Sequence, residues 1–308
     1  MATLLNMIDE VSMNLSGYTL QQDRATHITA DVAATASTIA APISLSLAST
    51  DSVGKGIVEI DEELFWIDNY DRVGNTATIA PYGRAYLGTT LAAHTAGTKV
   101  TIAPTFPRFV IKRAINDTIS AIGSSIFAAN TTTITSNSAV SAFRLPATGT
   151  TLNIRNILSI AYQALGSSKE WIPIRSYRFD GNANSTAFTS GQTVSIYDYI
   201  PSGRSVQIAY ATDPVPFTTN AEEFATKTGL PESCKDLIIL GATYRLLSNL
   251  DPARASMVSP QADETDSKRP YGSSQSVARQ IYALFTQRLN EEVKSQQEKY
   301  PIRVHYSL

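Results

Sequence analysis

The spacing of apolar residues changes several times along the chain, and each change predicts a different kind of element. Near the N-terminus apolar residues recur at helical spacing and Gly17 follows them, which predicts a short amphipathic helix. Between Ile111 and Ile126, isoleucines at steps of three and four residues predict a second helix. The N-terminal set consists of Leu4, Leu5, Ile8, Val11 and Leu15.

Two further helices are predicted near the C-terminus. Apolar residues fall at helical spacing between Leu237 and Leu247, and again between Val277 and Leu289. Ser273 and Ser274 can cap the last helix, and Pro301 stops it.

Residues 57–104 have the two-residue period of β-strands. Ile57–Ile60 and Leu64–Ile67 flank three acidic residues, which predicts a hairpin, and Gly74-Asn75 supplies a second turn. Further glycines break the rest of the segment, so a small antiparallel barrel or sandwich is expected.

Residues 128–219 also read as strands, with turns at regular intervals, and this predicts an antiparallel sandwich. The predicted strands are Ile154–Leu165, Glu170–Phe179, Gln192–Tyr197 and Ser205–Ala211.

A helix with one apolar stripe is not stable alone. The order of elements therefore predicts an α+β protein whose N-terminal, middle and C-terminal helices form one bundle, with two antiparallel β domains, a small barrel and a β-sandwich, inserted into it. The predicted domains are the bundle (1–17, 105–127 and 220–300), the barrel (18–104), the sandwich (128–219) and a C-terminal tail (301–308).

The formal net charge of −2 argues against general nucleic-acid binding through phosphate neutralisation. The charge is uneven, with five basic and eleven acidic residues in 1–104, against twenty and sixteen in 105–308. This suits charge-complementary contact with partners, or it is ordinary surface variation. We expect no membrane span and no secretory signal. Cys234 is expected to be a buried small hydrophobe.

Basic residues open the second predicted helix, where they oppose the helix macrodipole. They are Arg108, Lys112 and Arg113. An acidic neighbour, a DNA phosphate or plain solvation each explains them, so these three are candidate contacts with a lumen or a neighbour.

No pattern predicts catalysis, a cofactor or a metal. The three histidines lie far apart, so zinc is not expected, and Gly54-Lys55-Gly56 lacks the upstream glycine of a phosphate loop. Asp61, Glu62 and Glu63 are adjacent, and adjacent side chains on a hairpin point to opposite faces, which spoils a shared site. The sequence therefore predicts a protein that is not an enzyme.

Three segments together resemble head-to-tail adaptor proteins of tailed bacteriophages, also called head-completion or neck connector proteins. They are PYGRAYLGTTLAAHTAGTKV, FPRFVIKRAINDTISAI and the helical ending with LIILGATYRLLSNL and VARQIYALFTQRLNEEV. The resemblance implies a virion structural protein, assembled in the host cytoplasm and placed in the neck between head and tail. It further implies a homo-oligomeric ring of typically twelve copies beneath the portal protein, which conducts DNA without sequence specificity.

The same resemblance implies that the C-terminal tail docks on the portal. Ile302, Val304 and Tyr306 would be the anchors, and their alternation with polar residues suits strand addition. Tail or nozzle proteins would bind below the ring, and the two β domains would contact capsid, fibres or neighbouring subunits.

Two other functions stay open. One is another tail, collar or fibre-attachment protein of a phage. The other is a carbohydrate-binding or hydrolytic tail protein that uses the aromatic residues of the second β region, for which Glu170 and Asp180 are the available carboxylates.

Overall fold

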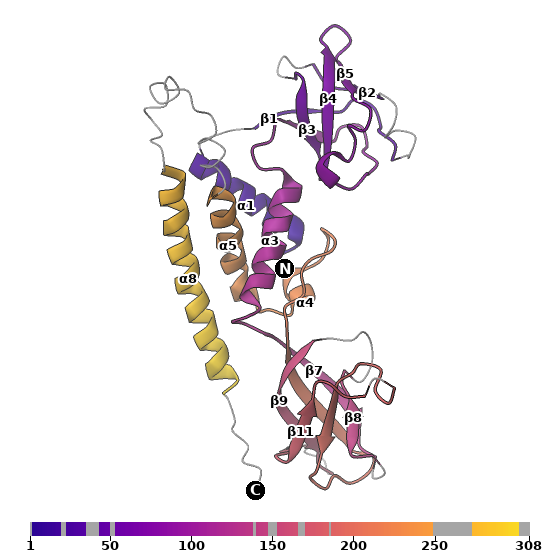
Figure 1. Cartoon of the computed structure of the whole chain (residues 1–308), viewed down its shortest axis with the longest axis vertical. Helices are drawn as coiled ribbons and strands as arrows, with labels where there is room; N and C mark the ends of the chain where they lie inside the picture. Colours follow the sequence, from indigo (N-terminus) through magenta and orange to yellow (C-terminus); the bar gives the residue numbers. More distant parts are fainter. Residues whose placement is uncertain are drawn as a thin grey trace. The chain divides into compact units, whose positions relative to one another are not determined.

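The computed structural model describes residues 2–19, 23–34, 43–49, 53–137, 140–146, 153–165, 170–184, 186–248 and 273–301 (Figure 1). The chain forms two compact units, each built from segments that are distant in sequence. One comprises Leu5–Ile115 and Ile239–Tyr282, and the other comprises Met1–Leu4, Asn116–Ile238 and Ala283–Leu308.

The first unit contains a six-stranded antiparallel sheet in the order β1-β6-β3-β4-β5-β2. Its two end strands meet through a bridge between Ile28 and Leu47, and Ala48 donates its N–H to the His27 carbonyl at 2.9 Å, so the sheet closes into a barrel. The strands are β1 (Arg24–His27), β2 (Ile43–Ser46), β3 (Gly56–Ile60), β4 (Glu63–Asp71), β5 (Thr76–Ile79) and β6 (Lys99–Ile102).

Apolar side chains from every strand of the barrel except β1 fill its interior, and Ile28, which follows β1, joins them. Val58 and Ile60 alternate with Ile57 and Glu59 along β3, as a two-residue period requires. The expected hairpin is present, because β3 pairs with β4 and Val58 lies opposite Phe65.

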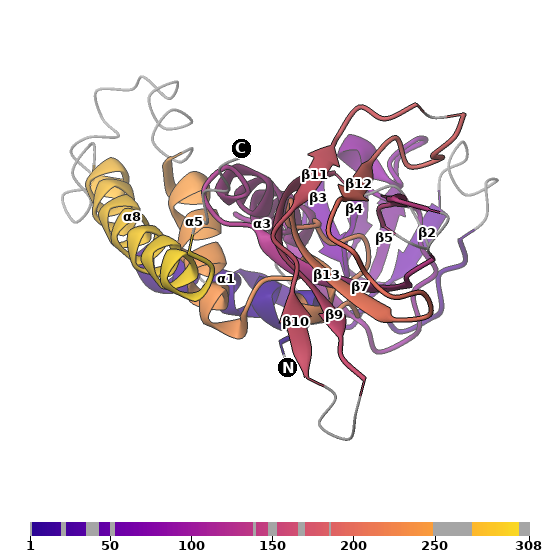
Figure 2. The same cartoon turned by 90° about the horizontal axis from the view of Figure 1, so that it is seen from below.

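The second unit contains two further antiparallel sheets, in the orders β10-β9-β13-β7 and β11-β12-β8 (Figure 2). Residues of both sheets share one apolar core, which includes Ile160, Val194 and Ile208. The strands are β7 (Ala128–Thr135), β8 (Ala142–Arg144), β9 (Ile154–Gln163), β10 (Trp171–Pro173), β11 (Tyr177–Asp180), β12 (Thr193–Ile196) and β13 (Ser205–Thr212).

The segment Glu170–Phe179 was predicted as one strand, and this is wrong. It divides into β10 and β11, which belong to different sheets. Pro173 is the last residue of β10, and the N–H of Ile174 still donates to the carbonyl of Ile160 in β9 at 2.9 Å. Ile174 is buried at the point where the chain passes from one sheet to the other.

Four of the five described α-helices lie near the positions that apolar spacing predicts, and the short helix Phe224–Thr228 was not predicted. The buried side of α1 holds four of the five predicted residues together with Met7, while Leu5 is 43% exposed. All five isoleucines of the second stripe are buried, although the helix itself ends at Ile122. The α-helices are α1 (Leu4–Thr19), α3 (Arg108–Ile122), α4 (Phe224–Thr228), α5 (Lys235–Ser248) and α8 (Ser273–Lys299).

The predicted organisation around a helical bundle is wrong. Among the described residues the chain is mixed α+β with five α-helices and three antiparallel sheets, and strands dominate the arrangement. An apolar stripe shows that a helix buries one face, but it does not identify the surface against which that face packs. In the described part the most extensive backbone contacts between elements join neighbouring strands of a sheet. The predicted domain bounds stay a prediction.

Candidate functional site

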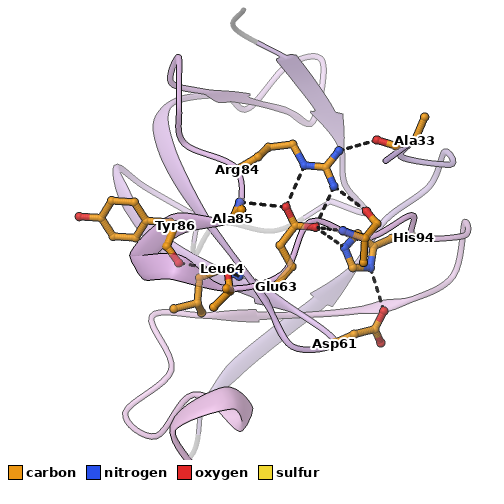
Figure 3. A network of polar contacts seen from close by, with 10 residues as sticks. Ala33, Asp61, Glu63, Leu64, Arg84, Ala85, Tyr86 and His94 are labelled. Atoms are coloured by element: carbon orange, nitrogen blue, oxygen red, sulfur yellow. Dashed lines mark hydrogen bonds and ion pairs between the residues drawn. The ribbon is translucent and has the colours of Figure 1, made fainter. Parts of the chain in front are cut away.

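The most distinctive segment of the sequence, PYGRAYLG, forms a loop on the barrel that ends with the short 3-10 helix η1 (Tyr86–Gly88). A network of polar side chains lies beneath this loop and joins it to β4 and to the turn before β4 (Figure 3). Its charged members are Asp61, Glu63, Arg84 and His94.

Arg84 and Glu63 form a two-point ion pair inside the barrel. Arg84 donates from Nε to Oε1 of Glu63 at 3.0 Å and from Nη2 to Oε2 at 2.8 Å, and both side chains have 0% exposure. Two further guanidinium N–H groups donate to the carbonyls of Ala33 and Ala92. A buried charge is tolerated only when it is paired and its hydrogen bonds are made, and this guanidinium meets that requirement.

Glu63 also accepts two backbone hydrogen bonds, from the N–H groups of Ala85 at 3.0 Å and Ala92 at 2.9 Å. Burial favours its neutral form, but the hydrogen bonds from His94 and Arg84 and from the backbone outweigh that effect. They lower the pKa of Glu63 to about 2. The carboxylate therefore stays ionised and ties together three separate parts of the loop region.

His94 bridges two carboxylates. Its Nε2 lies 3.0 Å from Oε2 of Glu63, and its Nδ1 lies 2.8 Å from Oδ2 of Asp61. Burial disfavours the charged imidazole, yet the hydrogen bonds to Glu63 and Asp61 prevail and raise the pKa of His94. The ring lies 5.7 Å from that of Phe65, which also receives the Arg84 guanidinium at 5.0 Å.

Sequence reasoning missed this network. It sought histidine partners at metal-ligand spacing and treated the three acidic residues as unable to share a site. Glu62 does point elsewhere, but Asp61 and Glu63 are two positions apart and both reach His94. The two-residue period of the hairpin was the available signal, because it places alternate side chains together.

The loop above the network has an unusual backbone. Tyr82, Ala85 and Leu87 have φ values of 58°, 49° and 55°, in the left-handed region that non-glycine residues rarely adopt. At Gly83 an added Cβ would lie 2.7 Å from the Ala80 carbonyl oxygen, so only glycine fits. The result is a loop fixed from inside, with Tyr82 70% exposed and Leu87 63% exposed.

The basic start of α3 meets carboxylates of the same unit. Arg108 pairs with Asp9 of α1 at 2.8 Å, and Lys112 pairs with Glu62 at 3.1 Å. Of the explanations left open, an acidic neighbour thus accounts for two of the three candidate residues. Arg113 is exposed.

A third carboxylate completes this arrangement. Glu59 is 3% exposed and accepts the backbone N–H of Arg108 at the first residue of α3. Burial is the largest influence on Glu59 and raises its pKa to about 7, although the N–H and the guanidinium of Arg108 act in the opposite direction. Much of the acidic excess of the N-terminal third is therefore used within the chain.

The proposed portal anchors Ile302, Val304 and Tyr306 lie outside the described residues. The chain is well fixed just before them. Gln296 donates to the carbonyl of Phe127 at 2.6 Å and accepts its N–H at 3.1 Å, and the rings of Phe127 and Tyr300 lie 5.8 Å apart.

The aromatic residues of the second β region divide between interior and surface. Tyr210 is buried, and Tyr177 and Phe179 pack against the core, whereas Tyr197 is 63% exposed and Tyr199 is 87% exposed. Of the two carboxylates considered for glycan hydrolysis, Asp180 accepts the N–H of Asn182 in a turn and Glu170 is exposed beside β10. They belong to segments of different sheets.

Cys234 is buried, as expected. Burial and the nearby Glu292 raise the pKa of its thiol to about 12. In the part of the chain that the structure describes, no three His, Cys, Asp or Glu side chains are placed to hold a metal ion. No helix among those residues has the length and apolar character needed to cross a bilayer.

No protein-family model and no curated protein matches this chain.

Proposed function

We propose that the chain is a structural protein of a tailed-phage virion, a head-to-tail adaptor that forms a ring beneath the portal and joins the capsid to the tail. The observation that carries the proposal is the PYGRAYLG loop. Its one charged residue, Arg84, is paired inside the barrel and holds the loop in shape, and its apolar residues Tyr82 and Leu87 point outward. Such an arrangement suits contact with another protein.

The buried residues of the polar network support the same interpretation. Glu63, Arg84 and His94 are occupied by one another and by backbone groups, so their chemistry is used to fix the fold. Arg108 and Lys112 are paired within their own unit, which leaves Arg113 as the candidate for contact with a neighbour or DNA.

In this proposal the partners are the portal protein, further copies of the chain, and tail or nozzle proteins, with DNA passing through the ring without sequence specificity. The tail residues Ile302, Val304 and Tyr306 dock on the portal by strand addition. Docking through a terminal segment is compatible with the firm attachment of the preceding Tyr300 and Gln296.

The test is co-sedimentation with purified portal rings. A chain ending at Tyr300 should keep its thermal unfolding transition but fail to sediment with portal, and Val304→Asp should fail in the same way. The double variant Arg303→Ser/His305→Ser changes the opposite side of the alternating segment and should still bind. Normal binding of the shortened chain would refute tail docking. Negative-stain images of the complex without a central ring would refute the adaptor role.

A further inference from the structure

Three carboxylates from three different segments of the chain converge on the start of α3. Asp9 comes from α1, Glu59 from β3, and Glu62 from the turn between β3 and β4. They bind the Arg108 guanidinium, the Arg108 backbone N–H and the Lys112 ammonium group, in that order. The contacts of Glu59 and Glu62 fasten the barrel to the start of α3, and that of Asp9 fastens α1 to it, within one compact unit.

Glu59 differs from the other two carboxylates in its burial. Its residue exposure is 3%, whereas the side chains of Asp9 and Glu62 are 53% and 25% exposed. A carboxylate at a helix N-terminus is normally stabilised by the free N–H groups and the macrodipole. At Glu59 the loss of hydration on burial disfavours the ionised carboxylate more than the backbone N–H and the guanidinium of Arg108 favour it.

We propose that Glu59 makes the connection between the barrel and α3 sensitive to pH, closed when its carboxyl group is protonated and loosened when it ionises. The protonated carboxyl still offers a carbonyl oxygen to the Arg108 N–H. Ionisation places a charge in a nearly dry site, and opening of the first helical turn lets water reach it.

The charged groups facing Glu59 act in both directions. Arg108 on α3 favours the ionised form, while Asp23 before β1 and Glu62 in the hairpin turn oppose it. Asp23 is held in place by the N–H of Thr105, at 3.3 Å, in the segment that leads into α3. Lys112 neutralises Glu62.

The direction in which pH changes the opening equilibrium follows from the raised pKa of Glu59. In the closed state Glu59 binds its proton with a pKa of about 7, and in the opened state it has the ordinary value of 4.5. The opened state therefore holds fewer protons between these values, and opening becomes easier as pH rises. The opening constant should increase up to about tenfold per pH unit between about pH 5 and 6.5 and level off above about pH 8.

Amide hydrogen exchange of the full chain tests this, with rates corrected for intrinsic pH dependence. The probes are the amides of Arg108, Val110 and Ile111 in the first turn, with Ile115 further along the helix as reference. Glu59→Gln keeps an oxygen for the Arg108 N–H but cannot ionise, so it should abolish the extra pH dependence. Glu62→Gln should retain the extra pH dependence. An unchanged pH dependence in Glu59→Gln would overturn the proposal.

A second measurement covers the case in which Glu59→Gln fails to fold. The side-chain carboxyl carbon of Glu59 in the unaltered protein is followed by NMR between pH 4 and 9. A titration midpoint near 7 supports the proposal, and a midpoint near 4.5 overturns it. Neither experiment requires portal protein, so its outcome is separate from that of the adaptor proposal.

Discussion

Glu63→Gln should lower the free energy of unfolding of the barrel by several kcal/mol at neutral pH. The substitution keeps the size of the side chain but removes the charge that compensates Arg84, whose side chain is 0% exposed. Removing one partner of a buried ion pair typically costs about 3–5 kcal/mol, because the other charge is left uncompensated.

The pKa of Glu63 gives an independent magnitude. The fold lowers it from 4.5 to about 2, and each unit corresponds to about 1.4 kcal/mol, so the ionised carboxylate contributes about 3 kcal/mol to stability. Because the folded-state pKa is the lower one, this contribution is complete above about pH 4.5 and is lost as pH falls towards 2. The difference between wild type and Glu63→Gln should therefore shrink over that range.

Tryptophan fluorescence can report the barrel alone. The chain has two tryptophans, and Trp66 lies on β4 with its ring 5.4 Å from that of Tyr86 in the loop. In a Trp171→Phe background, guanidinium unfolding followed by fluorescence reports the environment of Trp66. This matters because two compact units need not unfold in one transition.

Asp61→Asn is the matched control. It alters another carboxylate bound to His94, but the side chain of Asp61 is 62% exposed, so its loss should cost less than about 1 kcal/mol. A cost below about 1 kcal/mol for Glu63→Gln at pH 7 would refute the assigned role of the ion pair. So would a cost that stays constant down to pH 2.

Three further outcomes are expected. Gly83→Ala should destabilise the barrel by about 1–3 kcal/mol in the same assay, since its Cβ meets carbonyl oxygens, whereas Gly54→Ala, with open space around it, should be nearly neutral; equal effects would contradict this. His94→Gln should cost more stability at pH 5.5 than at pH 9, because a raised pKa gives stabilisation that is lost as pH rises; a cost independent of pH would refute the charged imidazole. Cys234 should resist alkylation by iodoacetamide at pH 8 until the protein unfolds, and rapid labelling of the native chain, measured by mass spectrometry, would contradict its high pKa.

Local patterns in the sequence identified most elements but not their assembly. The isoleucine steps in α3 and the alternation around Asp61–Glu63 depend on neighbours within a few residues, and both elements formed where expected. The bundle prediction required knowledge of which surface each apolar stripe contacts. A stripe contains no such information, and in the described part the most extensive backbone contacts between elements lie within the sheets.

The network was harder to predict for a related reason. Arg84 and His94 are 21 and 31 residues from Glu63, and nothing in local spacing joins them. The same holds for Glu59 and Arg108, which are 49 residues apart. The strand Ala128–Thr135 was not among the strands named from the sequence, although its register with β13 is continuous over eight residues.

The buried ion pair of Arg84 also has a consequence for how such a loop can evolve. Its shape is set by a side chain that faces inward and by Gly83, while Tyr82 and Leu87 face solvent and contribute little to the interior. In the adaptor role that we propose, recognition and folding are therefore carried by different residues of one short segment. On that proposal, single substitutions at the two outward positions would change the binding partner while the barrel keeps its stability.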